Sequence, residues 1–141
     1  MTGALILAVA DEGCGDSMNS MPYLARLASL AGTLDLHFVN SQRGRAILEA
    51  YRTPDGRAAT PTVIALDPLD RVVGCWVERP ETLLRWSRTP KDSLPANERF
   101  SDRRAWYAND KGRSALAEWV PMLERIARGE IACATVPASK N

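Results

Sequence analysis

The apolar residues of this chain occur in short continuous runs and in longer segments with helical spacing. Residues 4–10 (A-L-I-L-A-V-A) are apolar throughout, which predicts a strand buried on both faces. Apolar and polar residues alternate over 34–39, which predicts a second strand, and the helical pattern of 17–31 connects the two. Such a strand–helix–strand unit predicts parallel strands. Further strands are predicted over 62–66 and 71–77, and the four residues between them suit an antiparallel hairpin.

These elements predict an α/β fold with a central mixed four-stranded sheet flanked by helices, in which the first strand is central. Short helices are predicted over 43–52 and 81–86. Two C-terminal helices follow over 101–108, with Ser101 as N-cap, and over 114–128. The last helix carries one apolar stripe, which we expect to pack on the chain's own sheet rather than on a partner: Leu116, Trp119, Val120, Leu123 and Ile126.

The domain organisation follows from these elements and from the length of 141 residues, which suits one domain. We interpret residues 1–129 as a single domain. Its core spans 4–88, and a C-terminal helical extension spans 99–129. Residues 130–141 are expected to form a flexible tail, as chain ends commonly do.

Charge and cysteine usage exclude several classes of function. The formal net charge is +1, so nothing indicates binding to nucleic acid or to an anionic membrane, and no apolar run is long enough to span a bilayer. The three cysteines, at positions 14, 75 and 133, predict neither a disulfide framework nor a zinc site, and a single histidine adds little metal-binding capacity.

Cysteine usage also bears on the compartment. Cys75, in V-V-G-C-W, is expected to be a buried structural thiol. Unpaired cysteines are typical of a reducing cytosol, so a cytoplasmic location is predicted. Residues 8–10 (A-V-A) resemble a signal-peptide cleavage site. However, no Lys or Arg precedes them and the apolar run is only seven residues long, so we expect no secretion signal.

Candidate chemistry is concentrated in the segment D-E-G-C-G-D-S, between the first strand and the first helix. Cys14 is expected at the helix start, where unpaired N–H groups and a partial positive charge favour a nucleophilic thiolate. Ser17 can hydrogen-bond the sulfur or cap the first turn. Asp11, Glu12 and Asp16 oppose thiolate formation, but we expect them to be solvated and screened. Cys14 is therefore predicted to be the most reactive of the three thiols.

The spacing of this segment resembles that of the thioredoxin family. In that family a strand runs into W-C-x-x-C, a proline lies eight residues after the first Cys, and a Pro-Thr step opens a later strand. Here Cys14 and Pro22 are eight residues apart, and A-T-P-T at 59–62 opens the strand over 62–66. The resemblance covers residues 4–86. It implies a thioredoxin-like fold that lacks the usual N-terminal strand and helix, and therefore has an uncovered edge and face.

The resemblance also implies a site around Cys14. Pro61 is expected to be cis and to face Cys14, and the backbone of Thr60 is expected to pair with an extended substrate. Gly13 stands where the family usually has Trp. Arg79, in the loop after the last predicted strand, is expected to approach the site and offset its acidic residues. Gly13, Thr60, Pro61 and Arg79 are thus the predicted substrate-binding residues.

Two departures from the family limit the chemistry. The second cysteine of the motif is replaced by Ser17, and the family's buried acid, six residues before the first Cys, falls on Ala8. The usual dithiol cycle, in which a second thiolate resolves the mixed disulfide, cannot run at this site. We expect Cys133, in the C-terminal tail, not to replace the missing thiol.

Three functional hypotheses remain. The first is a monothiol thiol–disulfide oxidoreductase with Cys14 and Ser17 as catalytic residues. Its partner would be a disulfide-bearing protein or a glutathione mixed disulfide, with glutathione as the resolving co-substrate and neither metal nor other cofactor. The second is a redox-inactive binding module on a thioredoxin-like scaffold. The third is a glutaredoxin-like iron–sulfur carrier, because C-G-D-S resembles C-G-F-S, but the family's Val before the proline is Thr60 and no glutathione clamp follows the last strand.

Overall fold

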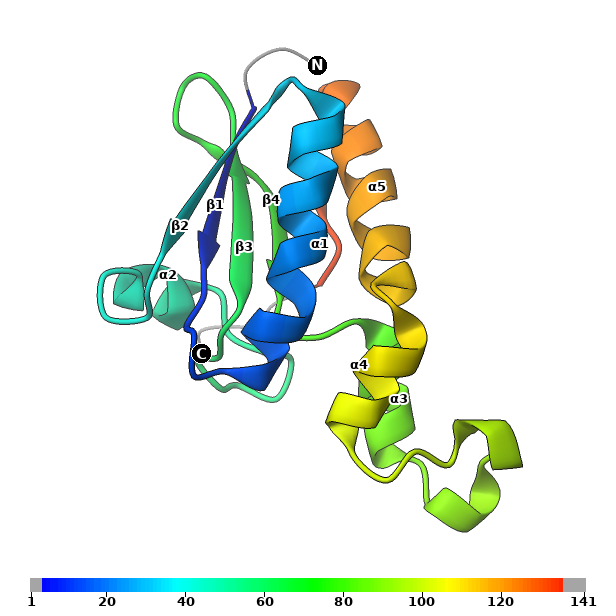
Figure 1. Ribbon diagram of the computed structural model, residues 1–141. Coiled ribbons are helices and arrows are strands. Elements are labelled where there is room, and N and C mark those ends of the chain that lie inside the picture. Colours follow the sequence, from blue (N-terminus) through cyan, green and yellow to red (C-terminus); the bar gives the residue numbers. More distant parts are fainter. Residues whose placement is uncertain (1–3, 136–141) are drawn as a thin grey trace.

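A computed structural model describes residues 4–135 and contains one mixed sheet with helices on both sides (Figure 1). The sheet has five strands in the order β2-β1-β3-β4-β5. β1 is parallel to β2 and antiparallel to β3, and β3 and β4 form the expected hairpin. The α/β fold and the central position of β1 are confirmed. The strands are β1 (Ala4–Val9), β2 (Leu34–Val39), β3 (Thr62–Leu66), β4 (Val72–Val77) and β5 (Ala132–Cys133).

The helices occur where helical spacing predicts them, with small shifts at their ends. α1 begins at Gly15, two residues before its predicted start, and runs through Pro22 to a left-handed cap at Gly32. Asp102, not Ser101, is the N-cap of α4, because its carboxylate accepts a 2.9 Å hydrogen bond from the Ala105 N–H. The helices are α1 (Gly15–Ala31), α2 (Arg45–Ala50), α3 (Glu81–Arg88), α4 (Arg103–Asp110) and α5 (Arg113–Ala127).

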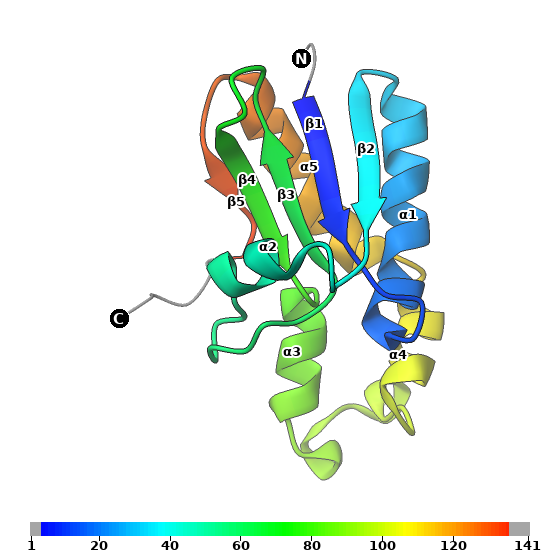
Figure 2. The same cartoon turned by 90° about the vertical axis from the view of Figure 1, so that its left-hand side faces the viewer.

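The main core lies between the sheet and two helices, α1 and α5, which lie side by side on one face (Figures 1 and 2). Trp119 of α5 is fully buried and packs edge-to-face on Trp76 of β4, with ring centroids 5.1 Å apart. The apolar stripe of α5 therefore packs on the chain's own core, as its spacing predicts, except for Val120, which is exposed. The turn before α5 requires Gly112, whose φ is +76° and whose missing Cβ leaves room for the Tyr23 ring.

The other face of the sheet is covered differently. α2 lies over one end of it (Figure 2). Gly44, just before α2, approaches the Val9 side chain, while Leu5 and Leu7 are only half-buried. β2 is the edge strand next to β1. This arrangement agrees with the predicted uncovered edge and face.

The C-terminal segment differs from the prediction of a flexible tail over residues 130–141. Ala132 and Cys133 form β5, parallel to β4, and the N–H of Ala134 donates a 2.8 Å hydrogen bond to the carbonyl oxygen of Cys75. The prediction is wrong for this stretch, because backbone pairing and burial of Ala132 dock it on the sheet. This docking also accounts for the fifth strand. The predicted flexibility of residues 136–141 lies outside the described residues.

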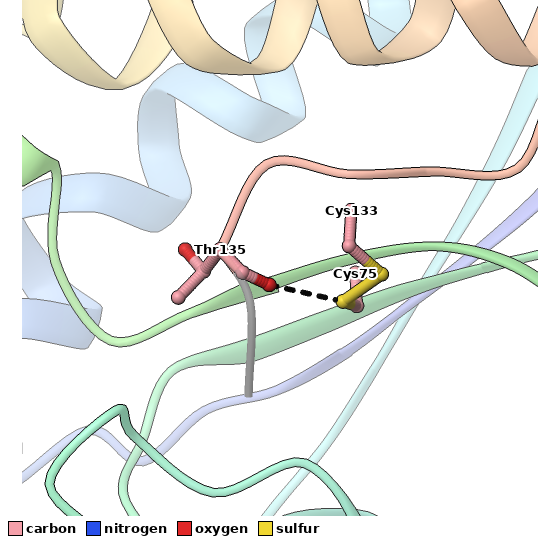
Figure 3. Close-up of a disulfide and its surroundings, with 3 residues drawn as sticks. All are labelled: Cys75, Cys133 and Thr135. Carbon is pink, nitrogen blue, oxygen red and sulfur yellow. Dashed lines mark hydrogen bonds between the residues drawn. A yellow bond between two sulfur atoms is a disulfide. The ribbon is translucent and has the colours of Figure 1, made fainter. Parts of the chain in front are cut away.

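Cys75 and Cys133 form a disulfide, so the prediction that the three cysteines form none is wrong (Figure 3). Cys75 is buried as predicted, but it is not a free structural thiol, because the pairing of β4 with β5 places the two cysteines opposite each other. The Thr135 carbonyl oxygen lies 3.2 Å from the Cys75 sulfur, which can donate a hydrogen bond to it only when the disulfide is reduced. The cytoplasmic prediction relied on unpaired cysteines, so it loses its main support.

Among the helices of residues 4–135, none combines the length and apolar character needed to cross a membrane.

We predict that Trp119→Ala lowers the free energy of unfolding by roughly 3–5 kcal/mol, because it opens a cavity against Trp76. Val120→Ala, at a partly exposed neighbouring position, is the matched control and should change stability by less than about 1 kcal/mol. Urea unfolding measures both variants. Equal midpoints for the two would contradict the packing of α5 described above.

The disulfide should contribute to stability, because it closes a loop of 58 residues in the unfolded chain. We expect Cys133→Ser to lower the free energy of unfolding by roughly 2–5 kcal/mol in protein prepared without reductant. Cys14→Ser, which leaves the pair intact, should have little effect. Recovery of three free thiols from unreduced, unfolded wild-type protein would refute the pairing.

Candidate functional site

Cys14 is the N-cap residue of α1 and lies in the turn that follows β1. Its N–H donates to the Asp11 carbonyl at 3.1 Å, and its own carbonyl accepts the first helical hydrogen bond, from Met18 at 3.0 Å. The side chain is half-buried and, of the cysteines described, the only one outside the disulfide. The sulfur therefore lies at the positive end of a 17-residue helix, as predicted.

The segment before β3 lies against this sulfur. The Thr60–Pro61 peptide bond is cis, the isomer expected from the sequence, and Cys14 Sγ lies 3.3 Å from the Thr60 carbonyl oxygen. Two hydrogen bonds hold the segment: Thr62 Oγ1 donates to the Ala59 carbonyl at 2.8 Å, and the Glu78 N–H donates to the Pro61 carbonyl at 2.7 Å. The structure thus brings Cys14, Thr60 and Pro61 together, although they are 46 residues apart in the chain.

Ser17 does not make the contact predicted for it. Its side chain is buried, and its hydroxyl oxygen accepts a 3.3 Å hydrogen bond from the Asp11 N–H rather than bonding the Cys14 sulfur. Because α1 begins at Gly15, Ser17 lies within the first turn and faces the interior. In this arrangement Ser17 fixes the loop that precedes Cys14.

Gly13 and Arg79 differ in their relation to the sulfur. Gly13 is exposed, and a side chain at this position would meet no atom within 4 Å, so the approach to Cys14 from this side is open. Arg79 reaches the site from the loop after β4 and pairs there with an acidic residue, as predicted: its Nε lies 3.1 Å from the Asp16 carboxylate. Contact of either residue with a substrate stays a prediction.

The three acidic residues near Cys14 have different surroundings. Glu12 is exposed, in line with the expected solvation. Asp11 is half-buried, and hydrogen bonds with Ser41, including a 2.8 Å bond from the Ser41 N–H, hold the pKa of its carboxyl below the usual value. Asp16 is only 3% exposed, so the prediction that it is solvated and screened is wrong. Its burial depends on partners from α4 and from the loop after β4, which no local pattern reveals.

A largely apolar groove of about 670 Å³ lies between the first half of α1 and the ends of β1 and β2. Residues before and after Cys14 line it, but Cys14 itself does not. Met18 and Phe38, which are 55% and 47% exposed, line it together with Pro22. Glu12 is also among the lining residues. Sequence reasoning missed this groove, because the exposure of Phe38 on β2 and of Met18 on α1 becomes visible only in the fold. Within residues 4–135, no group of three or more His, Cys, Asp or Glu side chains could hold a metal ion.

A family model described as thioredoxin matches residues 2–92, so the chain belongs to the thioredoxin family. Its fold is similar to that of a protein of unknown function from Pseudomonas aeruginosa, with a TM-score of 0.62 and 22% identity over 89% of this chain and 68% of that one. It is also similar to an HIV epitope-scaffold, with a TM-score of 0.62 and 18% identity over 87% of this chain and 67% of that one. Both likenesses concern the fold alone. No curated protein matches the sequence.

We predict that Cys14 is the first thiol to react in the folded, reduced protein. Cys75 is fully buried, and Cys133, which is half-buried like Cys14, lies on a strand and not at a helix N-terminus. Iodoacetamide labelling followed by peptide mass spectrometry should show Cys14 reacting at least about tenfold faster than Cys75. Unfolding in urea should abolish the difference. Equal rates in the folded state would contradict the site described here.

Proposed function

We propose that this thioredoxin-family protein is a thiol–disulfide oxidoreductase that works through Cys14 alone. The observation that carries the proposal is the position of a free thiol at the start of α1, 3.3 Å from the carbonyl that precedes cis-Pro61. Family membership supports a redox role in general. The monothiol route follows from Ser17, which replaces the second cysteine, and from the engagement of Cys75 and Cys133 with each other.

The proposed reaction is the removal of glutathione from a protein mixed disulfide. The Cys14 thiolate attacks the glutathione sulfur, so that a Cys14–glutathione disulfide forms while the protein thiolate leaves and takes up a proton. A second glutathione thiolate then attacks this intermediate, which releases glutathione disulfide and restores Cys14. Overall, one protein mixed disulfide and one glutathione give one protein thiol and one glutathione disulfide.

The surfaces around the sulfur suit an extended substrate. In the proposal, the backbone of Thr60 pairs with the segment that carries the disulfide, and Gly13 leaves room for it to approach. An apolar side chain next to the reacting cysteine would occupy the groove lined by Met18 and Phe38. Burial of such a side chain contributes roughly 1.5–3 kcal/mol, which is enough to select apolar-flanked disulfides over polar ones.

The proposal predicts that Cys14→Ser lowers the reduction of a glutathionylated peptide by glutathione to the uncatalysed rate, whereas Cys133→Ser retains the catalysed rate. The measurement couples glutathione disulfide formation to a reductase. Ser17→Cys should give insulin-reducing activity only in part, because Ala8 provides no proton acceptor where the family has a buried acid. If Cys14→Ser leaves every exchange rate unchanged, the protein is instead a redox-inactive binding module on the same fold.

A further inference from the structure

A buried carboxylate lies two residues after Cys14. Asp16, in the first turn of α1, is 3% exposed, and removal of a carboxylate from water is costly unless it is paired and hydrogen-bonded. A negative charge is favoured near a helix N-terminus. The same N–H groups, however, also stabilise a thiolate at Cys14, and a second anion nearby opposes that thiolate.

Three side chains from distant parts of the sequence compensate the Asp16 charge. The Tyr107 hydroxyl of α4 donates a 2.7 Å hydrogen bond to Oδ1, and Nε of Arg103, also on α4, lies 3.4 Å from the same oxygen. Arg79 Nε donates to Oδ2 at 3.1 Å. Burial, and then the Asp16 carboxylate, raise the pKa of Tyr107 well above its usual value, so its hydroxyl acts as a donor. The carboxylate is thus surrounded by two guanidinium groups and a phenol.

The same network reaches the cis-proline segment. Arg79 also lies 3.8 Å from Glu78, whose N–H is bonded to the Pro61 carbonyl. The Glu78 carboxylate in turn accepts two hydrogen bonds from Arg57, at 2.9 and 3.1 Å. Arg79 therefore joins the first turn of α1 to the segment that faces the Cys14 sulfur. No local sequence pattern requires α4 to take part in this junction.

We propose that Asp16 is a positioning residue for Cys14, and that Tyr107, Arg103 and Arg79 determine how strongly its charge acts on the sulfur. The inference rests on the proposed function, because it names the residues that control the reactivity of Cys14. It also makes the C-terminal helical extension part of the site. If Tyr107, Arg103 or Arg79 is removed, the negative charge of Asp16 is less well compensated and opposes the Cys14 thiolate more strongly. If Asp16 is made neutral, that opposition disappears.

Other charged groups face the same region and remain unchanged in the test. Asp11 and Glu12 precede Cys14, and the Asp11 carboxylate is held by Ser41. Glu78, which lies 3.8 Å from Arg79, is paired with Arg57. Since these groups are common to the wild-type protein and the variants, differences in the reactivity of Cys14 report on Asp16 and its partners.

The test measures the alkylation of Cys14 by iodoacetamide as a function of pH. Tyr107→Phe removes one donor and retains the ring, which packs on Trp106. It should slow alkylation at neutral pH by roughly twofold to fivefold and move the pH of half-maximal rate upward. The matched control Tyr23→Phe, half-buried on α1, should leave both unchanged. Arg103→Met should act in the same direction as Tyr107→Phe, whereas its exposed neighbour Arg104→Met should not.

Asp16→Asn should change the rate of Cys14 alkylation in the opposite direction. It removes the charge at nearly constant shape and should accelerate alkylation, and in its background Tyr107→Phe should no longer slow the reaction. If Asp16→Asn does not fold, the inference is tested by the Tyr107 and Arg103 variants and their controls alone. Equal rates for Tyr107→Phe and Tyr23→Phe would overturn the inference, and so would slower alkylation in a folded Asp16→Asn protein. Because alkylation needs no turnover, an inactive enzyme with these alkylation rates would contradict the proposed function and leave this inference standing.

Discussion

The fold depends on the burial of β1, a strand that is apolar on both faces and pairs with a neighbouring strand along each edge. α1 and α5 cover one face together, and the edge-to-face contact of Trp119 with Trp76 lies in this layer. On the other face, Gly44, just before α2, approaches Val9, and Leu5 stays half-buried. The helical extension after residue 99 is therefore part of the core, because the largest side chain of α5 is buried against the central sheet.

The same C-terminal helical extension also contributes a guanidinium group and a phenol to the surroundings of Asp16. α5 places α4 beside the N-terminal end of α1, and from there Tyr107 and Arg103 reach the carboxylate of Asp16. Without these donors, a carboxylate that is 3% exposed would be strongly destabilising, since an uncompensated buried charge costs several kcal/mol. Folding of the C-terminal helices and formation of the Cys14 site are thus linked through one ionised group.

The sequence predicted the elements whose signals are local and missed those that depend on distant contacts. β1, β2 and β3 have nearly the predicted bounds, because apolar runs and alternation encode burial directly. β5 has only two residues and no periodicity, so neither it nor the pairing of Cys75 with Cys133 was predictable. At the site, motif spacing located Cys14 beside the cis-proline segment. The inward orientation of Ser17 and the burial of Asp16 depend on tertiary partners that the spacing does not encode.

The three cysteines are divided between a disulfide, Cys75–Cys133, and a free thiol, Cys14, and this division constrains the redox chemistry. A monothiol route at Cys14 needs a reducing thiol, and that thiol must leave the Cys75–Cys133 disulfide intact if the fold is to persist. Exchange requires access to a sulfur: Cys75 is fully buried in β4, Cys133 is half-buried, and backbone pairing holds the two residues side by side. If an external thiolate attacks the Cys133 sulfur, a mixed disulfide forms and Cys75 is released as a thiolate. The pairing of β5 with β4 holds that thiolate beside the mixed disulfide, so that its attack expels the external thiol and re-forms the Cys75–Cys133 bond. The pairing of β5 with β4 can therefore let one small protein hold a stable disulfide and an exchangeable thiol under the same conditions.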